Sequence, residues 1–176
     1  MKVAARQLLK QAGKAAGFDI RRLSKEMPTG IPDAELYQPL FSPWRSAAFA
    51  AEYAPIAPWT LVSEDRCYVL ATLASQASQL DGEFWECGVY RGGTAMLFAE
   101  RLSTAGTRLR LFDTFEGMPE TDAARDTHKA GDFSDTSLEA VRSRVRGDFV
   151  HFHKGLIPET FSGLESSQIA FAHVDV

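Results

Sequence analysis

The chain has 176 residues, of which 45% are hydrophobic and 24% are charged, and its net charge at neutral pH is −4. This length and composition are sufficient to bury one domain core, and they exclude a disordered or collagen-like chain. No apolar run approaches the roughly 18 residues of a membrane-spanning helix, and no signal-peptide pattern is present, so we expect a cytoplasmic protein. Cys67 and Cys87 are too few for a disulfide framework and too far apart for a CxxC site, which predicts reduced core thiols.

The basic residues are concentrated at the N-terminus. Seven of the 19 basic residues, but only one of the 23 acidic residues, fall within positions 1–25, so the rest of the chain carries a net charge of −10. That remainder is a poor candidate for binding nucleic acid. Positions 1–25 have the spacing of an amphipathic helix with a basic stripe. We favour the solvated face of a terminal helix over attachment to an acidic membrane surface or partner.

Residues 27–58 contain six prolines, which break long regular elements and predict loops with short helices. Aromatic side chains in this stretch could line a substrate pocket, although packing of an extension on the following domain is favoured. We therefore expect a helical, proline-rich extension over residues 1–59 and one domain over residues 60–176.

Apolar periodicity predicts alternating helices and strands after residue 60. The expected helices cover 63–79, 94–103 and 137–145, with a short helix from Pro158, and the expected strands cover 84–89, 107–112, 149–153 and 169–176. Strands that alternate with helices favour a parallel, doubly wound, Rossmann-like α/β sheet. The long polar stretch 114–136 is typical of a mobile lid or functional loop.

Four strands are fewer than such a sheet needs, so we expect that the fold is incomplete and that the chain is truncated at its C-terminus. An unpaired apolar edge strand is an aggregation hazard unless something covers it. The oligomeric state stays open, with a homo-oligomer as one alternative.

The stretch 82–94 (GEFWECGVYRGGT) combines a predicted strand, a glycine turn and the start of a helix. Such a junction leaves backbone amides unpaired at a positive helix end, which suits a carboxylate or phosphate. Its GxxxGG spacing differs from the GxGxxG of nicotinamide-binding proteins, and this disfavours a dehydrogenase.

Several motifs together resemble the TylF/MycF family of class I S-adenosylmethionine-dependent O-methyltransferases. They are ECGVYRGGT (86–94), FDTFEGMP (112–119), GDF (131–133), KG (154–155) with PET (158–160), and HVD (173–175). The resemblance implies a transferase that methylates a hydroxyl of a sugar or other small molecule. Its implied cofactors are S-adenosyl-L-methionine and Mg²⁺.

The resemblance also implies cofactor-binding roles for residues of the glycine turn. Glu86 faces the methionine end of the cofactor, and Tyr90 and Thr94 lie where related enzymes hold its carboxylate. Gly88 and Gly92 allow close backbone approach. For Glu86, a salt-bridged acid beside a strand is the less favoured alternative.

Four further residues are candidate cofactor contacts. Asp113 follows Gly88 by 25 residues at the end of the second strand, where a carboxylate can accept both ribose hydroxyl protons; a turn cap is its alternative. Lys154 and Gly155 follow the third strand, near where such folds contact adenine. For Asp132, a contact from the lid and a local Asx-turn are equally weighted.

Asp175 ends the fourth strand, and the resemblance implies that it is the first carboxylate of a Mg²⁺ site. Family members supply the other carboxylates from later residues, so one ligand does not make a competent site, and no general base is assigned. Zinc binding by His151, His153 and His173 is disfavoured, because strand histidines more often make ordinary hydrogen bonds. The second hypothesis for the chain is a truncated, noncatalytic nucleotide-binding or interaction module.

Overall fold

The structure is a computed structural model that describes residues 11–13, 15–16, 42–120 and 127–176. The chain divides into two compact units, Met1–Phe41 and Ser42–Val176, and the second contains the sheet. Most of the helix predicted over 1–25 lies outside the described residues, although positions 11–13 and 15 are helical. No helix within the described ranges is long and apolar enough to cross a membrane.

The second unit alternates helices and strands. Its strands are β1 (Glu83–Cys87), β2 (Leu109–Asp113), β3 (Val150–Lys154) and β4 (Ile169–Val174). Its helices are α2 (Ala47–Tyr53), α3 (Glu64–Ala77), α4 (Gly93–Leu102) and α5 (Leu138–Arg144), with 3-10 turns η1 (Pro43–Arg45), η2 (Ala57–Trp59) and η3 (Glu159–Phe161). Every strand and helix predicted after residue 60 forms, with ends shifted by one or two residues.

The strands of the described residues form one parallel sheet in the order β3-β2-β1-β4. The predicted parallel α/β architecture is therefore confirmed. From β1 the chain proceeds outward through β2 to β3 and then crosses to the other side of β1 to make β4. The strand order thus reverses between β1 and β4, and ligands of such sheets bind at the carboxyl ends of the strands at this reversal.

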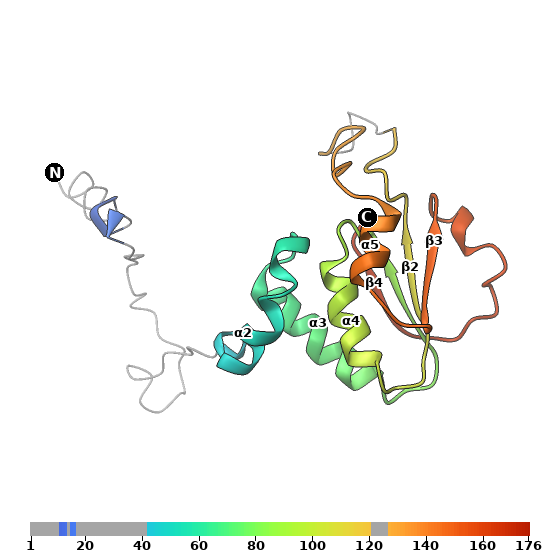
Figure 1. The fold of residues 1–176 in the computed structure, drawn as a ribbon, viewed down its shortest axis with the longest axis horizontal. Coiled ribbons are helices and arrows are strands. Elements are labelled where there is room, and N and C mark those ends of the chain that lie inside the picture. Colours follow the sequence, from blue (N-terminus) through green and yellow to red (C-terminus); the bar gives the residue numbers. More distant parts are fainter. Residues whose placement is uncertain (1–10, 14, 17–41, 121–126) are drawn as a thin grey trace, which may run out of the picture. The chain divides into compact units, whose positions relative to one another are not determined.

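The two faces of β1 are buried by different segments, as the period-two alternation of a strand requires. Phe84 belongs to the main core, where it lies with Phe98 of α4 and Val141 of α5. Trp85 and Phe112 face the other way, against the connection that follows β3. Figure 1 shows this connection on the side of the sheet opposite α4 and α5. The sheet is covered by helices on one face and by an irregular segment on the other.

Residues 43–59, assigned from sequence to the extension, pack against the helices of the second unit. Phe49 and Ile56 are buried with Cys67 of α3 and Leu97 of α4. Phe49 also meets the Tyr68 ring edge to face at 5.1 Å. Phe49 thus makes the packing contacts that the favoured alternative expects. Both cysteines are buried and unpaired, which confirms their predicted state.

Candidate functional site

The glycine turn between β1 and α4 lies at the reversal of strand order and leads into the first turn of α4. Gly92 has a φ of +87° and accepts a hydrogen bond from the Met96 amide, which starts the helix. A Cβ atom at Gly92 would lie 2.9 Å from a methyl carbon of Val141 in α5. The close approach that requires glycine here is therefore made by a neighbouring helix of the chain.

Gly88 brings the turn against the residues that follow β4. Its φ is +87°, and a Cβ atom there would lie 2.0 Å from the Asp175 carbonyl oxygen. The Asp175 amide donates to the Cys87 carbonyl at 2.8 Å, which holds this crossing in place. The structure thus joins the predicted metal ligand to the predicted cofactor turn through backbone contacts. Approach of a cofactor to Gly88 and Gly92 stays a prediction.

The Asp113 carboxylate fastens the turn to the end of β2. Its Oδ2 atom accepts from the amides of Val89 at 2.6 Å and Tyr90 at 2.9 Å, and its Oδ1 atom accepts from the Phe115 amide at 2.6 Å. By accepting from these backbone amides Asp113 caps the turn, which is the alternative role considered for it from the sequence. Each carboxylate oxygen can accept more than one hydrogen bond, so a ribose contact at Asp113 stays a prediction.

Glu86 is wholly buried at the end of β1 and pairs with β4. Its exposed fraction is 0%, and it stands opposite His173 in the register of the two strands. The His173 Nδ1 atom lies 3.2 Å from Glu86 Oε1. Glu86 Oε2 is also buried and has no hydrogen-bond partner among the described residues. Of the two carboxylate oxygens, Oε1 is therefore in contact with His173, and Oε2 has no hydrogen-bond partner among the described residues.

Burial and the contact between Glu86 and His173 shift the pKa of each group in opposite directions. Burial raises the pKa of Glu86, and the contact with His173 opposes that rise. Burial lowers the pKa of His173, but the adjacent Glu86 carboxylate outweighs it, and the net pKa of the imidazole is raised. The pair places an acid and a base in contact between β1 and β4, where the strand order reverses.

Tyr90 lies in the glycine turn, and Thr94 lies in the first turn of α4. Thr94 is 5% exposed in the first turn of α4. Tyr90 has a φ of +53°, and its carbonyl accepts from the Thr136 hydroxyl at 2.6 Å. Arg91 forms an ion pair with Asp135. The end of the predicted lid, residues 114–136, is thereby tied to the glycine turn.

The remaining candidate residues lie near Asp113 or on the loop. Asp132 Oδ2 accepts from the Lys129 amide at 2.9 Å, so its carboxylate makes a local loop contact. Gly155 donates from its amide to the Asp113 carbonyl at 3.0 Å, and Lys154 stands opposite Asp113 in the β2–β3 register. Lys154 also pairs with Glu116 at the start of the loop. The candidate adenine and ribose residues are therefore neighbours.

Comparison with known proteins decides the family. The family model described as macrocin-O-methyltransferase (TylF) matches residues 43–176, about three quarters of the chain. The chain belongs to this family. The resemblance inferred from the motifs is thereby confirmed. No curated protein sequence matches the chain.

Two solved structures share the fold. The O-methyltransferase NovP aligns with a TM-score of 0.55 at 18% identity, covering 66% of this chain and 55% of NovP. CalS11, described as a calicheamicin methyltransferase, aligns with a TM-score of 0.50 at 15% identity, covering 89% of this chain and 74% of CalS11. At these identities the likeness shows the fold alone. The aligned part of the chain spans about half the length of NovP.

The described residues do not fit the predicted Mg²⁺ site. No group of three or more histidine, cysteine, aspartate or glutamate side chains within the described ranges is placed to hold a metal ion. Asp175 is exposed and stands as a single carboxylate. His153 stacks on Phe112, on the sheet face opposite the one that carries His173, so these histidines do not converge. We derive no chemical step through a metal.

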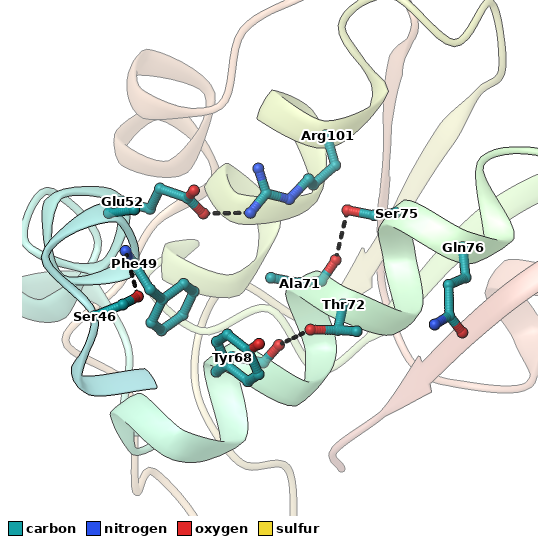
Figure 2. A pocket seen from close by; sticks show the side chains of 10 residues that line it. Ser46, Phe49, Glu52, Tyr68, Ala71, Thr72, Ser75, Gln76 and Arg101 are labelled. Atoms are coloured by element: carbon teal, nitrogen blue, oxygen red, sulfur yellow. Dashed lines mark hydrogen bonds and ion pairs between the residues drawn. The ribbon is translucent and has the colours of Figure 1, made fainter. Parts of the chain in front are cut away.

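A cavity of about 400 Å³ is lined by residues of α2, α3 and α4 (Figure 2). Phe49 and Tyr68 line it, and Glu52 forms an ion pair there with Arg101. Arg101 is near the end of α4, about 12 Å along the helix from Gly93 at 1.5 Å per residue. The cavity is therefore separate from the predicted cofactor site.

Proposed function

We propose that this chain binds S-adenosyl-L-methionine and belongs to an O-methyltransferase that acts on a hydroxyl of a sugar or other small molecule. The observation that carries the proposal is the family match, which spans the entire sheet unit from residue 43 to residue 176. The position of the glycine turn at the reversal of strand order supports it.

Glu86 fits the methionine end of this cofactor. A buried acceptor without a partner is costly, and the free Oε2 atom of Glu86 is such an acceptor. An ammonium group would supply the missing donor together with an opposite charge. We assign Tyr90 and Thr94 to the cofactor carboxylate, Asp113 to the ribose, and Lys154 and Gly155 to the adenine side.

The chemistry supplied by the bound cofactor is an activated methyl group on a sulfonium. The contribution of the chain is then to bind and orient, because proximity and alignment can remove much of the barrier of a bimolecular transfer. The turn is suited to this role, since Asp113 fixes two of its amides and Arg91 ties it to the loop. A rigidly held turn would keep the methyl group of the cofactor aligned with the acceptor hydroxyl.

Two finer parts of the proposal rest on the resemblance alone. Mg²⁺ dependence is proposed from the family resemblance, since Asp175 alone does not make a metal site among the described residues. The sugar or small-molecule acceptor is likewise proposed from the family.

A noncatalytic nucleotide-binding or interaction module remains the second candidate. The observation that favours it is the position of β4 at an edge of the described sheet. An exposed strand edge can add a strand from a partner. Partner-dependent methyl transfer would count against this candidate, and cofactor binding without transfer in any assembled state would support it.

The site assignment is tested by titrating the chain and two variants calorimetrically with S-adenosylhomocysteine. Glu86→Ala and Asp113→Ala should each weaken binding about tenfold or more, because each removes a charged hydrogen-bond acceptor. Glu100→Ala is the matched control, since Glu100 is an exposed acid towards the other end of α4. Unchanged affinity in both site variants would contradict the assignment.

A further inference from the structure

Glu86 and His173 join β1 to β4 at the point where ligands of this kind of sheet bind. They are register partners on adjacent parallel strands, and 3.2 Å separates His173 Nδ1 from Glu86 Oε1. The His173 side chain is 11% exposed, and the Glu86 side chain is 0% exposed. The contact is therefore a buried one between two strands.

The imidazole of His173 is fixed by packing as well as by this hydrogen bond. The Phe98 ring of α4 meets it edge to face, with 5.8 Å between ring centroids. An ionised Glu86 carboxylate can only accept, so in the state that binds a cation the His173 nitrogen facing Oε1 is the donor. Strand, helix and hydrogen bond together leave the Glu86 carboxylate with one defined orientation.

Apart from the Thr94 hydroxyl, which lies close enough to lower the pKa of Glu86, no other side chain of the described residues is aimed at the second carboxylate oxygen. Glu86 Oε2 is buried and has no hydrogen-bond partner among the described residues. An unsatisfied buried acceptor normally costs free energy and calls for an explanation. A ligand donor that arrives on binding is such an explanation.

Nearby charges favour a cationic donor. The carboxylates of Asp113 and Asp175 act on this pair from β2 and from the end of β4, while Arg66 of α3 is the opposing positive charge. The Asp113 charge raises the pKa of Glu86, and the Asp175 charge raises that of His173, so both carboxylates favour positive charge at this pair. The amino-acid end of the proposed cofactor carries an ammonium group, whose positive charge matches this field.

We infer that His173 is a positioning residue that holds Glu86 with Oε2 free for the ammonium group of the cofactor. This inference rests on the proposed function. Because Oε2 is closed off from solvent, the ammonium group reaches it only after the covering residues shift. The charge pair then forms away from water, where it is stronger than at the surface.

The test compares two ligands that differ at the methionine end. S-Adenosylhomocysteine carries the ammonium group, and 5′-methylthioadenosine lacks the amino-acid portion. In calorimetric titrations of the full chain, His173→Leu should weaken binding of S-adenosylhomocysteine about tenfold or more and leave binding of methylthioadenosine unchanged.

Two further replacements of His173 compare a side chain that keeps the hydrogen-bond donor near Nδ1 with one that moves the donor away. His173→Asn should restore the affinity for S-adenosylhomocysteine to near the wild-type value, because its amide donates from about the position of Nδ1. His173→Gln reaches instead towards the position of Nε2, so it should resemble the leucine variant, and it replaces that variant if leucine prevents folding. His151→Leu, on β3, is the matched control and should bind both ligands as the wild type does.

Three outcomes would overturn the inference. One is wild-type affinity for S-adenosylhomocysteine in both His173→Leu and His173→Gln. Another is an equal loss for both ligands, which marks a purely structural role. Failure of the wild-type chain to bind either ligand is distinct from these, because it overturns the proposed function and this inference with it.

Discussion

Asp113 shows how one side chain can shape the site. Its carboxylate accepts three backbone amides, two from the glycine turn and one from the loop after β2. Charged acceptors form stronger hydrogen bonds than neutral ones. The residue therefore fixes the turn before any ligand arrives, and a ribose contact would add to this role.

Gly88 is the residue at which substitution should cost most in the turn. In Gly88→Ala the new methyl group would meet the Asp175 carbonyl at 2.0 Å, in a backbone conformation with φ +87°. We expect a loss of about 2 kcal/mol or more in the free energy of unfolding, measured by urea denaturation.

Gly106→Ala is the control for that substitution. Gly106 also has a positive φ, but nothing lies within 4 Å of the position of its Cβ atom. It should lose about 1 kcal/mol, the cost of the backbone conformation alone. Equal losses at the two positions would show that the contact with Asp175 is absent in solution.

At the residue scale, motifs predicted the turn but missed its partners. Glu86 stood out because an acid precedes a glycine turn at the end of an apolar strand. Its pairing with His173 depends on β4 lying beside β1 in a particular register, and a single sequence specifies neither. The ion pair of Arg91 with Asp135 was missed for the same reason, since 44 positions separate the two residues.

Among the elements, β1 and β2 are joined by a charged cluster on the face away from the helices. Glu83 accepts from Arg110 at 2.5 and 3.0 Å and from Arg108 at 3.1 Å, and its side chain is 13% exposed. The hydrogen bonds from Arg110 lead the effects that lower the pKa of Glu83 to about 2. The cluster adds charged hydrogen bonds between β1 and β2 to the contact of Trp85 with Phe112 on the same face.

This pKa predicts a defined loss of stability in acid. The folded-state pKa lies below the ordinary value of 4.5, so the stabilisation is complete above about pH 4.5 and is lost as the pH falls towards 2. Glu83→Gln should lower the free energy of unfolding at pH 7 by about 2 to 3 kcal/mol. The difference from wild type should shrink between pH 4.5 and 2 in urea titrations. A difference independent of pH would contradict the role of the carboxylate charge.

The elements themselves were predictable because their local signals agree. The apolar run of β1 ends at a glycine, and helical spacing begins again at α4 and α5. The loop between β2 and α5 was predicted as a lid from its length and polarity. Within that loop the Met118 amide donates to the Asp132 carbonyl, and at its end the Thr136 hydroxyl donates to the Tyr90 carbonyl. Such contacts between distant segments leave no local signal.

For the whole molecule, the site depends on the order of the strands. Alternating elements predicted a parallel sheet, but the placement of β4 beside β1 follows only from the folded chain. That placement brings Glu86, the glycine turn and Asp175 together. The cavity beside α2 lies apart from these residues, so the turn is the candidate cofactor site.

Cofactor recognition by the chain is tested most directly by titrating S-adenosylhomocysteine calorimetrically into the purified chain, with NAD⁺ as the comparison ligand. We expect saturable, one-to-one binding of S-adenosylhomocysteine and none of NAD⁺, because the turn has the GxxxGG spacing and an acid at its start. A chain that unfolds cooperatively but binds no S-adenosylhomocysteine, or that prefers NAD⁺, would contradict the assignment of this sheet as a methyltransferase cofactor domain.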